Sequence, residues 1–235
     1  LFEAIHPKNM TAGRWPSSIE YGLYAAQVGA VNTIFTNLRS QEGIQGVNGP
    51  PGTGKTTLLL DVIAEIVVER ARVISTLGCD GLFKKGYTKI EKETGFESYT
   101  YNLHPSLQKN FGIVVASSNN AAVENISKEI PLKSKIDLDN FPEADYFSEC
   151  CTKLTHKESW GALAAPLGNS KNRKHFKESF WNIKEEKKNS IYFHDVLYEV
   201  YKNKDSGQDK TPYYVNSFDH QNKRFQSLLA EFESF

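Results

Sequence analysis

The chain has 235 residues, of which 39% are hydrophobic, and its 28 Lys and Arg residues are balanced by 28 Asp and Glu residues. A formal net charge of zero excludes a global electrostatic attraction to nucleic acid, membranes or acidic partners, so any nucleic-acid site would be a local groove. The length suits one large domain or a core with an appendage, and no apolar run reaches the roughly 18 residues that a membrane span needs.

The start of the chain and its cysteines indicate the setting. The first residues, Leu-Phe-Glu-Ala-Ile-His, lack an initiating Met and the features of a signal peptide, so we expect a piece of a longer protein. The odd, sparse set of Cys79, Cys150 and Cys151 favours a reducing compartment, hence a cytoplasmic location. Cys150, Cys151 and His156 match no common zinc spacing, so we interpret the cysteines as small buried apolar residues.

The first predicted elements are an irregular lead over residues 1–18 and a helix from about Ser18 to Asn37. The lead contains Pro, Gly and Ser, which favour turns. The helix is predicted to begin here because Ser17 and Glu20 have the spacing of a capping box. Its apolar face would consist of Tyr21, Tyr24, Ala25, Val28, Val31 and Phe35.

Residues 49–56 read Gly-Pro-Pro-Gly-Thr-Gly-Lys-Thr and match the phosphate-binding pattern G-x-x-x-x-G-K-[ST]. Residues 43–48 before this octet are partly apolar and are predicted as a buried strand. Residues 56–71 after it have helical periodicity, with Leu59, Val62, Ile63, Ile66 and Val67 on the apolar positions and Asp61, Glu65, Glu69 and Arg70 between them. Strand, glycine loop and helix is the order that a P-loop requires. A glycine-rich turn that binds nothing is the alternative.

The residue types in this octet suit a nucleotide triphosphate. Glycines at 49, 52 and 54 permit backbone angles that let N–H groups turn inward around phosphate oxygens. Lys55 would bind the β- and γ-phosphates, Thr56 would be a Mg²⁺ ligand, and both are predicted as catalytic. The following helix directs the positive end of its dipole at the same anion. The predicted nucleotide-binding residues here are Gly49, Pro50, Pro51, Gly52, Thr53, Gly54, Lys55, Thr56 and Thr57.

After the P-loop helix, residues 72–110 are predicted as an insertion with some β-structure, because polar residues and tyrosines alternate from Phe96 to Tyr101. Residues 111–117 are a continuous apolar run and are predicted as a second buried strand. A helix follows from Asn120 to Ile130, where Pro131 ends it. Two strand–helix units predict an α/β fold, a P-loop NTPase with a parallel sheet and helices on both faces.

Residues 131–235 are predicted as a mainly helical accessory region, either an insertion or a subdomain. Residues 203–212 indicate a turn or loop. The last segment, residues 223–235, is predicted as a helix with an apolar side formed by Phe225, Leu228, Leu229 and Phe232.

Two further segments, together with the P-loop, suggest a family. Gln27 lies 22 residues before Gly49 in the segment 25–32, and residues 116–126 read Ala-Ser-Ser-Asn-Asn-Ala-Ala-Val-Glu-Asn-Ile. With these segments the chain resembles the superfamily 1 DNA/RNA helicases, in the branch of the nonsense-mediated-decay helicase. It is most similar to large bacterial AAA domain-containing members, which carry stretches like 13–17 and 167–173. The resemblance covers about residues 13–71 and 111–130, and it implies a RecA-like core over residues 19–130.

The resemblance implies roles for single residues. Gln27 would read adenine, since an amide offers a donor and an acceptor to its edge, and ATP would be preferred over GTP. Taken alone, Gln27 would be a glutamine on a helix surface. Ser118, Asn119 and Asn120 would contact the backbone of single-stranded DNA or RNA. For Asn119 and Asn120, a helix cap is the alternative.

The resemblance also implies parts that this sequence does not supply. Hydrolysis needs a carboxylate near Mg²⁺ and an arginine, which the family provides in an Asp-Glu motif and a second RecA-like domain. No apolar strand here ends in Asp-Glu, and the nearest imitation, residues 191–195, is interrupted by His194, so we interpret it as part of a helix. We therefore expect these parts elsewhere in a longer protein.

The resemblance implies an ATPase that moves on single-stranded DNA or RNA and whose present segment binds ATP without being catalytically complete. Other P-loop enzymes stay possible, although the base-reading motif of a GTPase is not matched by the spacing of residues 203–205. A small-molecule kinase would leave residues 116–126 unexplained. A nucleotide-gated binding or defence module without unwinding activity is a further alternative.

Overall fold

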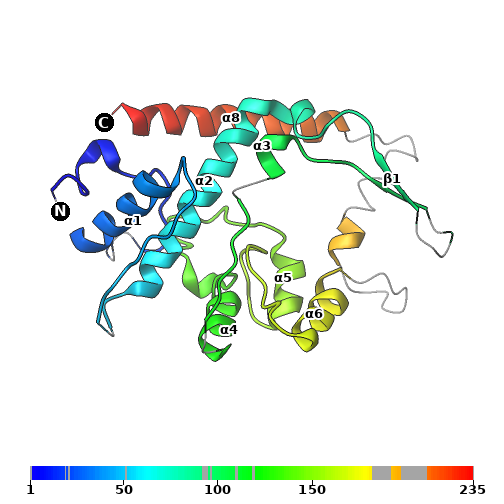
Figure 1. Cartoon of the computed structure of the whole chain (residues 1–235). Coiled ribbons are helices and arrows are strands. Elements are labelled where there is room, and N and C mark those ends of the chain that lie inside the picture. Colours follow the sequence, from blue (N-terminus) through cyan, green and yellow to red (C-terminus); the bar gives the residue numbers. More distant parts are fainter. Residues whose placement is uncertain are drawn as a thin grey trace. The chain divides into compact units, whose positions relative to one another are not determined.

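A computed structural model describes residues 2–18, 20, 22–50, 52–91, 95, 97–108, 111–117, 120–181, 192–196 and 211–234, with backbone only for residues 98, 120–123 and 211–215. The chain divides into two compact units (Figure 1). The first contains Leu1–Trp15, Leu23–Ile113 and Pro212–Phe235, and the second contains Pro16–Gly22 and Val114–Thr211. The sequence-based division at residues 18 and 130 stays a prediction.

The first unit is built around two helices, α1 (Ala25–Leu38) and α2 (Lys55–Gly81). Helix α1 begins seven residues later than predicted, and the capping box assigned to Ser17 and Glu20 is wrong. Tertiary hydrogen bonds explain the difference, because the Trp15 N–H donates to Asp61 and Pro16 O accepts from the Asp137 N–H. These bonds hold Trp15 and Pro16 in tertiary contacts, and Tyr24, with φ −67° and ψ 154°, becomes the N-cap.

Helix α2 extends well beyond its predicted end at residue 71. Its regular backbone is interrupted at Gly78, whose φ of 66° and ψ of 174° are non-helical. Contacts with the C-terminal helix α8 (Thr211–Glu233) hold the additional turns. Asn222 Nδ2 donates to Ser75 O at 3.2 Å, and Arg72 Nη1 lies 2.5 Å from Glu233 Oε1. The predicted C-terminal helix is confirmed and is longer than residues 223–235.

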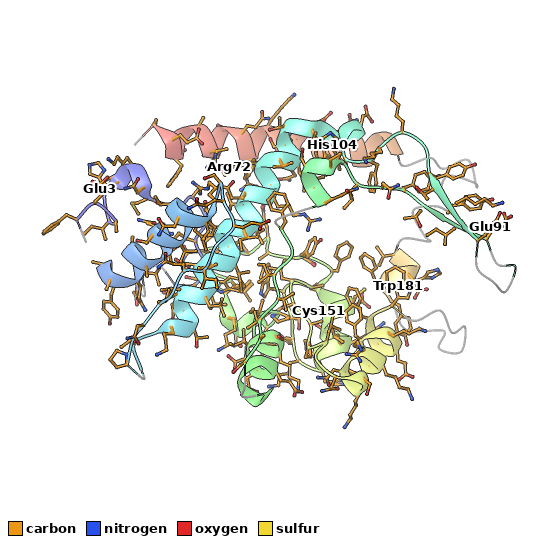
Figure 2. The ribbon with its side chains drawn as sticks, in the orientation of Figure 1. Glu3, Arg72, Glu91, His104, Cys151 and Trp181 are labelled. Carbon is orange, nitrogen blue, oxygen red and sulfur yellow. The ribbon has the colours of Figure 1, made fainter. Side chains whose placement is uncertain are left out.

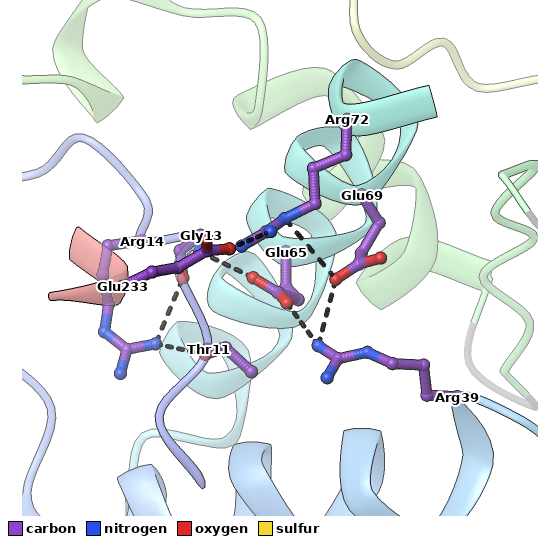
Figure 3. Close-up of polar contacts among 8 residues, drawn as sticks. All are labelled: Thr11, Gly13, Arg14, Arg39, Glu65, Glu69, Arg72 and Glu233. Carbon is purple, nitrogen blue, oxygen red and sulfur yellow. Dashed lines mark hydrogen bonds and ion pairs between the residues drawn. The ribbon is translucent and has the colours of Figure 1, made fainter. Parts of the chain in front are cut away.

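The lead segment, which also includes the short 3₁₀ helix η1 (Pro7–Asn9), lies along α1 and α2. Two acidic side chains of α2 accept its backbone N–H groups. The distance is 2.9 Å from Trp15 N to Asp61 Oδ1, and 2.6 Å from Gly13 N to Glu65 Oε2, the second bond being drawn in Figure 3. Asn32 of α1 donates to Ala4 O at 2.8 Å. Thr11 and Trp15 are buried, so this irregular segment is part of the core.

Both acidic residues are buried, with 5% of Asp61 and 1% of Glu65 exposed. Arg39, which follows α1, lies 2.7 Å from Glu65 Oε1 and 3.1 Å from Glu69 Oε1. Desolvation raises the pKa of Glu65 above its usual value, and Arg39 opposes that rise. Desolvation likewise raises the pKa of Asp61, against the Trp15 N–H and Arg14. Burying these carboxylates costs free energy, which their hydrogen bonds and ion pairs offset.

The segment after α2 forms a hairpin of β1 (Thr88–Glu91) and β2 (Glu97–Thr100), followed by α3 (Pro105–Gln108). The strands are antiparallel, with Thr88 opposite Thr100 and Lys89 opposite Tyr99. The predicted β-structure within residues 72–110 is therefore confirmed.

The predicted parallel sheet is not formed by the described residues, whose only sheet is this hairpin. Residues 43–48 and 111–117 have no strand pairing, so both strand predictions are wrong for this structure. Ile44 is 99% exposed and Val114 is 92% exposed, where burial was expected. An apolar run predicts that a segment can be a strand, whereas only neighbouring strands and covering helices make it one.

The second unit begins its helical part with α4 (Asn120–Glu129), which ends before Pro131 as predicted. The 3₁₀ helix η3 (Lys133–Lys135), α5 (Ser148–Thr155), α6 (Ser170–Phe176) and the π-helical turn η4 (Lys177–Trp181) follow. Residues 193–196 form a further helical turn, and the predicted loop at 203–212 lies mostly outside the described residues. The helical character expected after residue 144 is confirmed for 148–155, 170–181, 193–196 and 211–233, whereas residues 156–169 form no helix.

The core of the second unit contains Cys150, Leu154 and Phe180, against which Phe147, Ala162, Ala165, Phe176, Phe193 and Val196 pack. Phe180 stacks on Phe176 and Phe193, with ring centroids 5.0 and 5.2 Å away. Cys150 and Cys151 are buried thiols that form no disulfide, as the apolar interpretation predicted, and burial raises the pKa of each. Figure 2 shows Cys151 inside this unit.

A search of the described helices for a membrane span found none with the length and hydropathy required.

The docking of the lead segment on α2 predicts a specific sensitivity at Gly13. A Cβ at this position would overlap the backbone of Ala64 and Glu65, so Gly13→Ala should lower the free energy of unfolding by about 1–3 kcal/mol. Urea denaturation followed by circular dichroism measures this change. Gly112→Ala is the matched control, since a Cβ there would have no neighbour within 4 Å, and we expect a change of at most about 0.5 kcal/mol. Equal stabilities of the two variants would contradict the docking.

Candidate nucleotide-binding site

The P-loop connects an extended segment to α2, and its backbone needs glycine at two positions. Gly52 has φ 82° and Gly54 has φ 72°, in the left-handed region that a side chain disfavours. Gly49 is restricted by space, because a Cβ there would lie 2.7 Å from Thr53 Oγ1. The three glycines of the octet, Gly49, Gly52 and Gly54, therefore each meet a local steric or conformational requirement.

Polar contacts inside the loop hold its shape. Lys55 Nζ donates to Gly49 O at 2.7 Å and to Pro50 O at 2.9 Å. Thr53 Oγ1 donates to Pro50 O at 2.8 Å. The Lys55 ammonium therefore lies over the loop, where it could also bind a phosphate oxygen. Pro51 lies outside the described residues.

The N-terminus of α2 supplies donors for an anion. Its first helical backbone bond runs from Leu58 N to Gly54 O at 3.0 Å, so the amides of residues 55–57 precede the helical hydrogen-bond pattern. Lys55, Thr56 and Thr57 are exposed. Amides of a helix N-terminus, an ammonium and an exposed hydroxyl suit a phosphate chain, and the Thr56 hydroxyl as a Mg²⁺ ligand stays a prediction.

Gln27 contacts this loop directly. Its Nε2 donates to Thr53 O at 3.1 Å and to Gly54 O at 3.2 Å, and its Oε1 accepts from the Tyr24 N–H at 2.8 Å. The first turn of α1 is thereby fastened to the P-loop. Because its side chain bonds the P-loop backbone, Gln27 is more than a glutamine on a helix surface. Adenine reading by Gln27 stays a prediction, and it would require the amide to exchange some of these bonds.

A family model described as an AAA domain matches residues 25–223, which is most of the chain. The chain belongs to this AAA domain family. Its members are superfamily 1 helicase-like domains, which confirms the resemblance at the superfamily level and implies the P-loop NTPase fold. No curated protein and no solved structure matches the chain.

The match places the site within a P-loop ATPase domain of the helicase-like type. The AAA domain model begins at residue 25, the first residue of α1, and thus includes Gln27 as well as the P-loop. Helices α1 and α2, which hold these two features against each other, both lie inside the matched range.

Sequence reasoning missed the residues that fix α2. Asp61 and Glu65 were placed between the apolar positions, yet they are buried, and Val67, assigned to the apolar face, is 42% exposed. Their spacing of four residues on one helix face was a usable signal. This spacing did not identify a partner, because the two carboxylates accept hydrogen bonds from the backbone N–H groups of residues 13 and 15. No side-chain pattern in the sequence distinguishes those two N–H groups.

The other predicted site residues are only partly covered. Ser118 and Asn119 lie outside the described residues, and of Asn120 only the backbone is described, as the first residue of α4. Their contact with nucleic acid stays a prediction.

The segment at 191–195 does not act as a strand-end acidic motif. Residues 193–196 are helical, and Asp195 Oδ2 accepts from the Tyr192 N–H at 2.9 Å, so the interpretation as part of a helix is confirmed. Within the described parts of the chain, no group of three or more His, Cys, Asp or Glu residues could hold a metal ion.

The position of Lys55 leads to a direct test. Lys55→Ala removes the ammonium that would bind the phosphates, so we expect ATP affinity to fall by about a hundredfold, measured by isothermal titration calorimetry. Lys223→Ala, at an exposed position of α8, should leave the affinity unchanged. Equal ATP affinity of wild type and Lys55→Ala would contradict the assignment of the P-loop as the phosphate-binding site.

The contacts of Gln27 predict a combined effect on affinity and specificity. Gln27→Ala removes two hydrogen bonds to the P-loop and the proposed contact to adenine. ATP affinity should fall by about tenfold, and the preference for ATP over GTP should disappear. Competition binding with the two nucleotides measures both. If ATP and GTP weaken equally and the preference is retained, the adenine assignment is wrong and Gln27 only braces the loop.

Proposed function

We propose that the chain is the ATP-binding part of a nucleic-acid-dependent ATPase that couples ATP hydrolysis to movement on single-stranded DNA or RNA. The observation that carries this proposal is the P-loop itself, with left-handed Gly52 and Gly54 and an exposed Lys55 at the start of a long helix. Membership of the AAA domain family supports an ATPase of the helicase-like type.

The proposed division of work follows from the geometry of the loop. The backbone of residues 49–54 and the first amides of α2 would hold the phosphates, and Lys55 would neutralise the β- and γ-phosphate charge. Thr56 would hold Mg²⁺, which supplies charge neutralisation in phosphoryl transfer. Gln27 would keep Thr53 and Gly54 in place through its two donated hydrogen bonds.

The proposal includes partners beyond ATP. Residues 118–120 would contact the backbone of the single strand, and a second RecA-like domain of the native protein would supply the missing arginine and carboxylates. The three cysteines form no disulfide in the described structure, which supports the proposed cytoplasmic location, because reducing compartments keep cysteines as thiols.

ATP turnover by the chain within its native protein tests this function. We expect single-stranded DNA or RNA to stimulate turnover by at least about tenfold, and we expect Lys55→Ala to abolish the stimulated rate. A phosphate-release assay with and without an oligonucleotide measures both. Tight ATP binding with no turnover under either condition would contradict the motor and support a nucleotide-gated binding module instead.

A further inference from the structure

One face of the β1–β2 hairpin presents three tyrosines to solvent. Lys89 lies opposite Tyr99 in the register, and side chains alternate along each strand, so residues 87, 89, 99 and 101 share one face. Tyr87 is 60% exposed, Tyr99 52% and Tyr101 63%. We call Tyr87, Tyr99 and Tyr101 the tyrosine face. Figure 1 shows the hairpin leading away from the end of α2.

A bulge in the hairpin brings these rings together. Lys84 N donates to Asn102 O, and Thr88 is the partner of Thr100, so residues 85–87 lie opposite Tyr101 alone. Gly86 has φ 84°, which lets the longer strand fold out its extra residues. The Tyr87 ring consequently lies 5.0 Å from the Tyr99 ring and 6.2 Å from the Tyr101 ring, at 86° and 68°.

The hairpin does not need this arrangement for its own core. Edge-to-face contacts between the rings contribute about 0.5–1.5 kcal/mol each. More than half of the surface of each of these three tyrosines nevertheless remains exposed to solvent. The opposite face carries Ile90, whereas the described side chains of the tyrosine face include no aliphatic residue. A cluster of exposed, nearly perpendicular rings offers flat surfaces to planar ligands.

The charge around the tyrosine face is uneven along the hairpin. Lys89 lies 2.9 Å from Glu91 and 2.5 Å from Glu97, so this lysine is neutralised at the outer end, which Glu91 marks in Figure 2. At the inner end, Lys84 and Lys85 are exposed and pair with no carboxylate of the described chain. Tyr87, two and three residues along the chain from these lysines, therefore lies toward the positive end, whereas Tyr99, whose hydroxyl donates to Glu97 Oε2, lies toward the acidic end.

We propose that the tyrosine face with Lys84 and Lys85 binds single-stranded nucleic acid, through bases stacked on the rings and phosphates held by the two lysines. Aromatic rings beside positive charge are the combination that binds single strands without sequence preference. A site for a protein partner would be expected to include aliphatic side chains, and the described side chains of the tyrosine face include none. The inference rests on the proposed function and adds a contact surface separate from residues 118–120.

Fluorescence anisotropy of a labelled oligothymidylate and oligouridylate of about 16 nucleotides with the full chain tests the proposal. The double variant Tyr99→Ala, Tyr101→Ala should raise Kd by about 10- to 100-fold. Tyr99→Phe with Tyr101→Phe keeps both rings and should keep Kd within about twofold of wild type. Lys84→Gln with Lys85→Gln should reduce the slope of log Kd against log salt by about 1.4.

Two controls keep the result interpretable. Ile90→Ala removes a large side chain from the opposite face of the same hairpin and should leave Kd unchanged, and ATP affinity should be equal in all these variants. If wild type binds the oligonucleotides and the tyrosine-to-alanine variant binds them equally, or if the phenylalanine variant is as weak as the alanine variant, this proposal is wrong while the proposed function stands. If wild type binds neither oligonucleotide and they do not stimulate turnover, the proposed function fails together with it.

Discussion

The buried carboxylates of α2 are the constraint on which the first unit depends. Glu65 accepts the Gly13 N–H with one oxygen and pairs with Arg39 through the other, so one side chain joins the lead, α1 and α2. Asp61, one turn earlier, accepts the Trp15 N–H. A carboxylate so deeply buried is tolerated only because it is bonded, and removing a partner would leave an uncompensated charge. The interactions therefore specify one docked position for the lead segment.

This arrangement matters for the nucleotide site because α2 begins at the P-loop. The other end of α1 reaches the same loop through Gln27, which donates to Thr53 O and Gly54 O. Helix α1 is thus fastened to α2 near both of its ends, by Gln27 at the loop and by Arg39 at Glu65 and Glu69. A phosphate cradle made of backbone amides works only when that backbone is held in place, since nothing else positions the donors.

The hairpin and the second unit place their aromatic residues differently. Its ladder and bulge position three rings that the fold itself leaves exposed, whereas the second unit buries its aromatic residues in a stack around Phe180. Large aromatic side chains usually enter a core, so their placement on an outward face indicates a partner. The family match supports an ATPase of the helicase-like type, and the exposed rings support the proposed single-strand surface.

The sequence by itself determined the parts whose information is local. The octet at 49–56, the helix after it, the helix ended by Pro131 and the alternation at Tyr99 and Tyr101 each depend on neighbouring residues, and the structure contains them. Only the tertiary structure decided the start of α1, the burial of Asp61 and Glu65, and the bonding of Gln27 to the loop. Those features join residues 26 to 121 positions apart, and backbone N–H and C=O groups supply at least one partner in each. Because every residue other than proline carries the same N–H group, no pattern of side chains could have identified which ones the buried acids would bind.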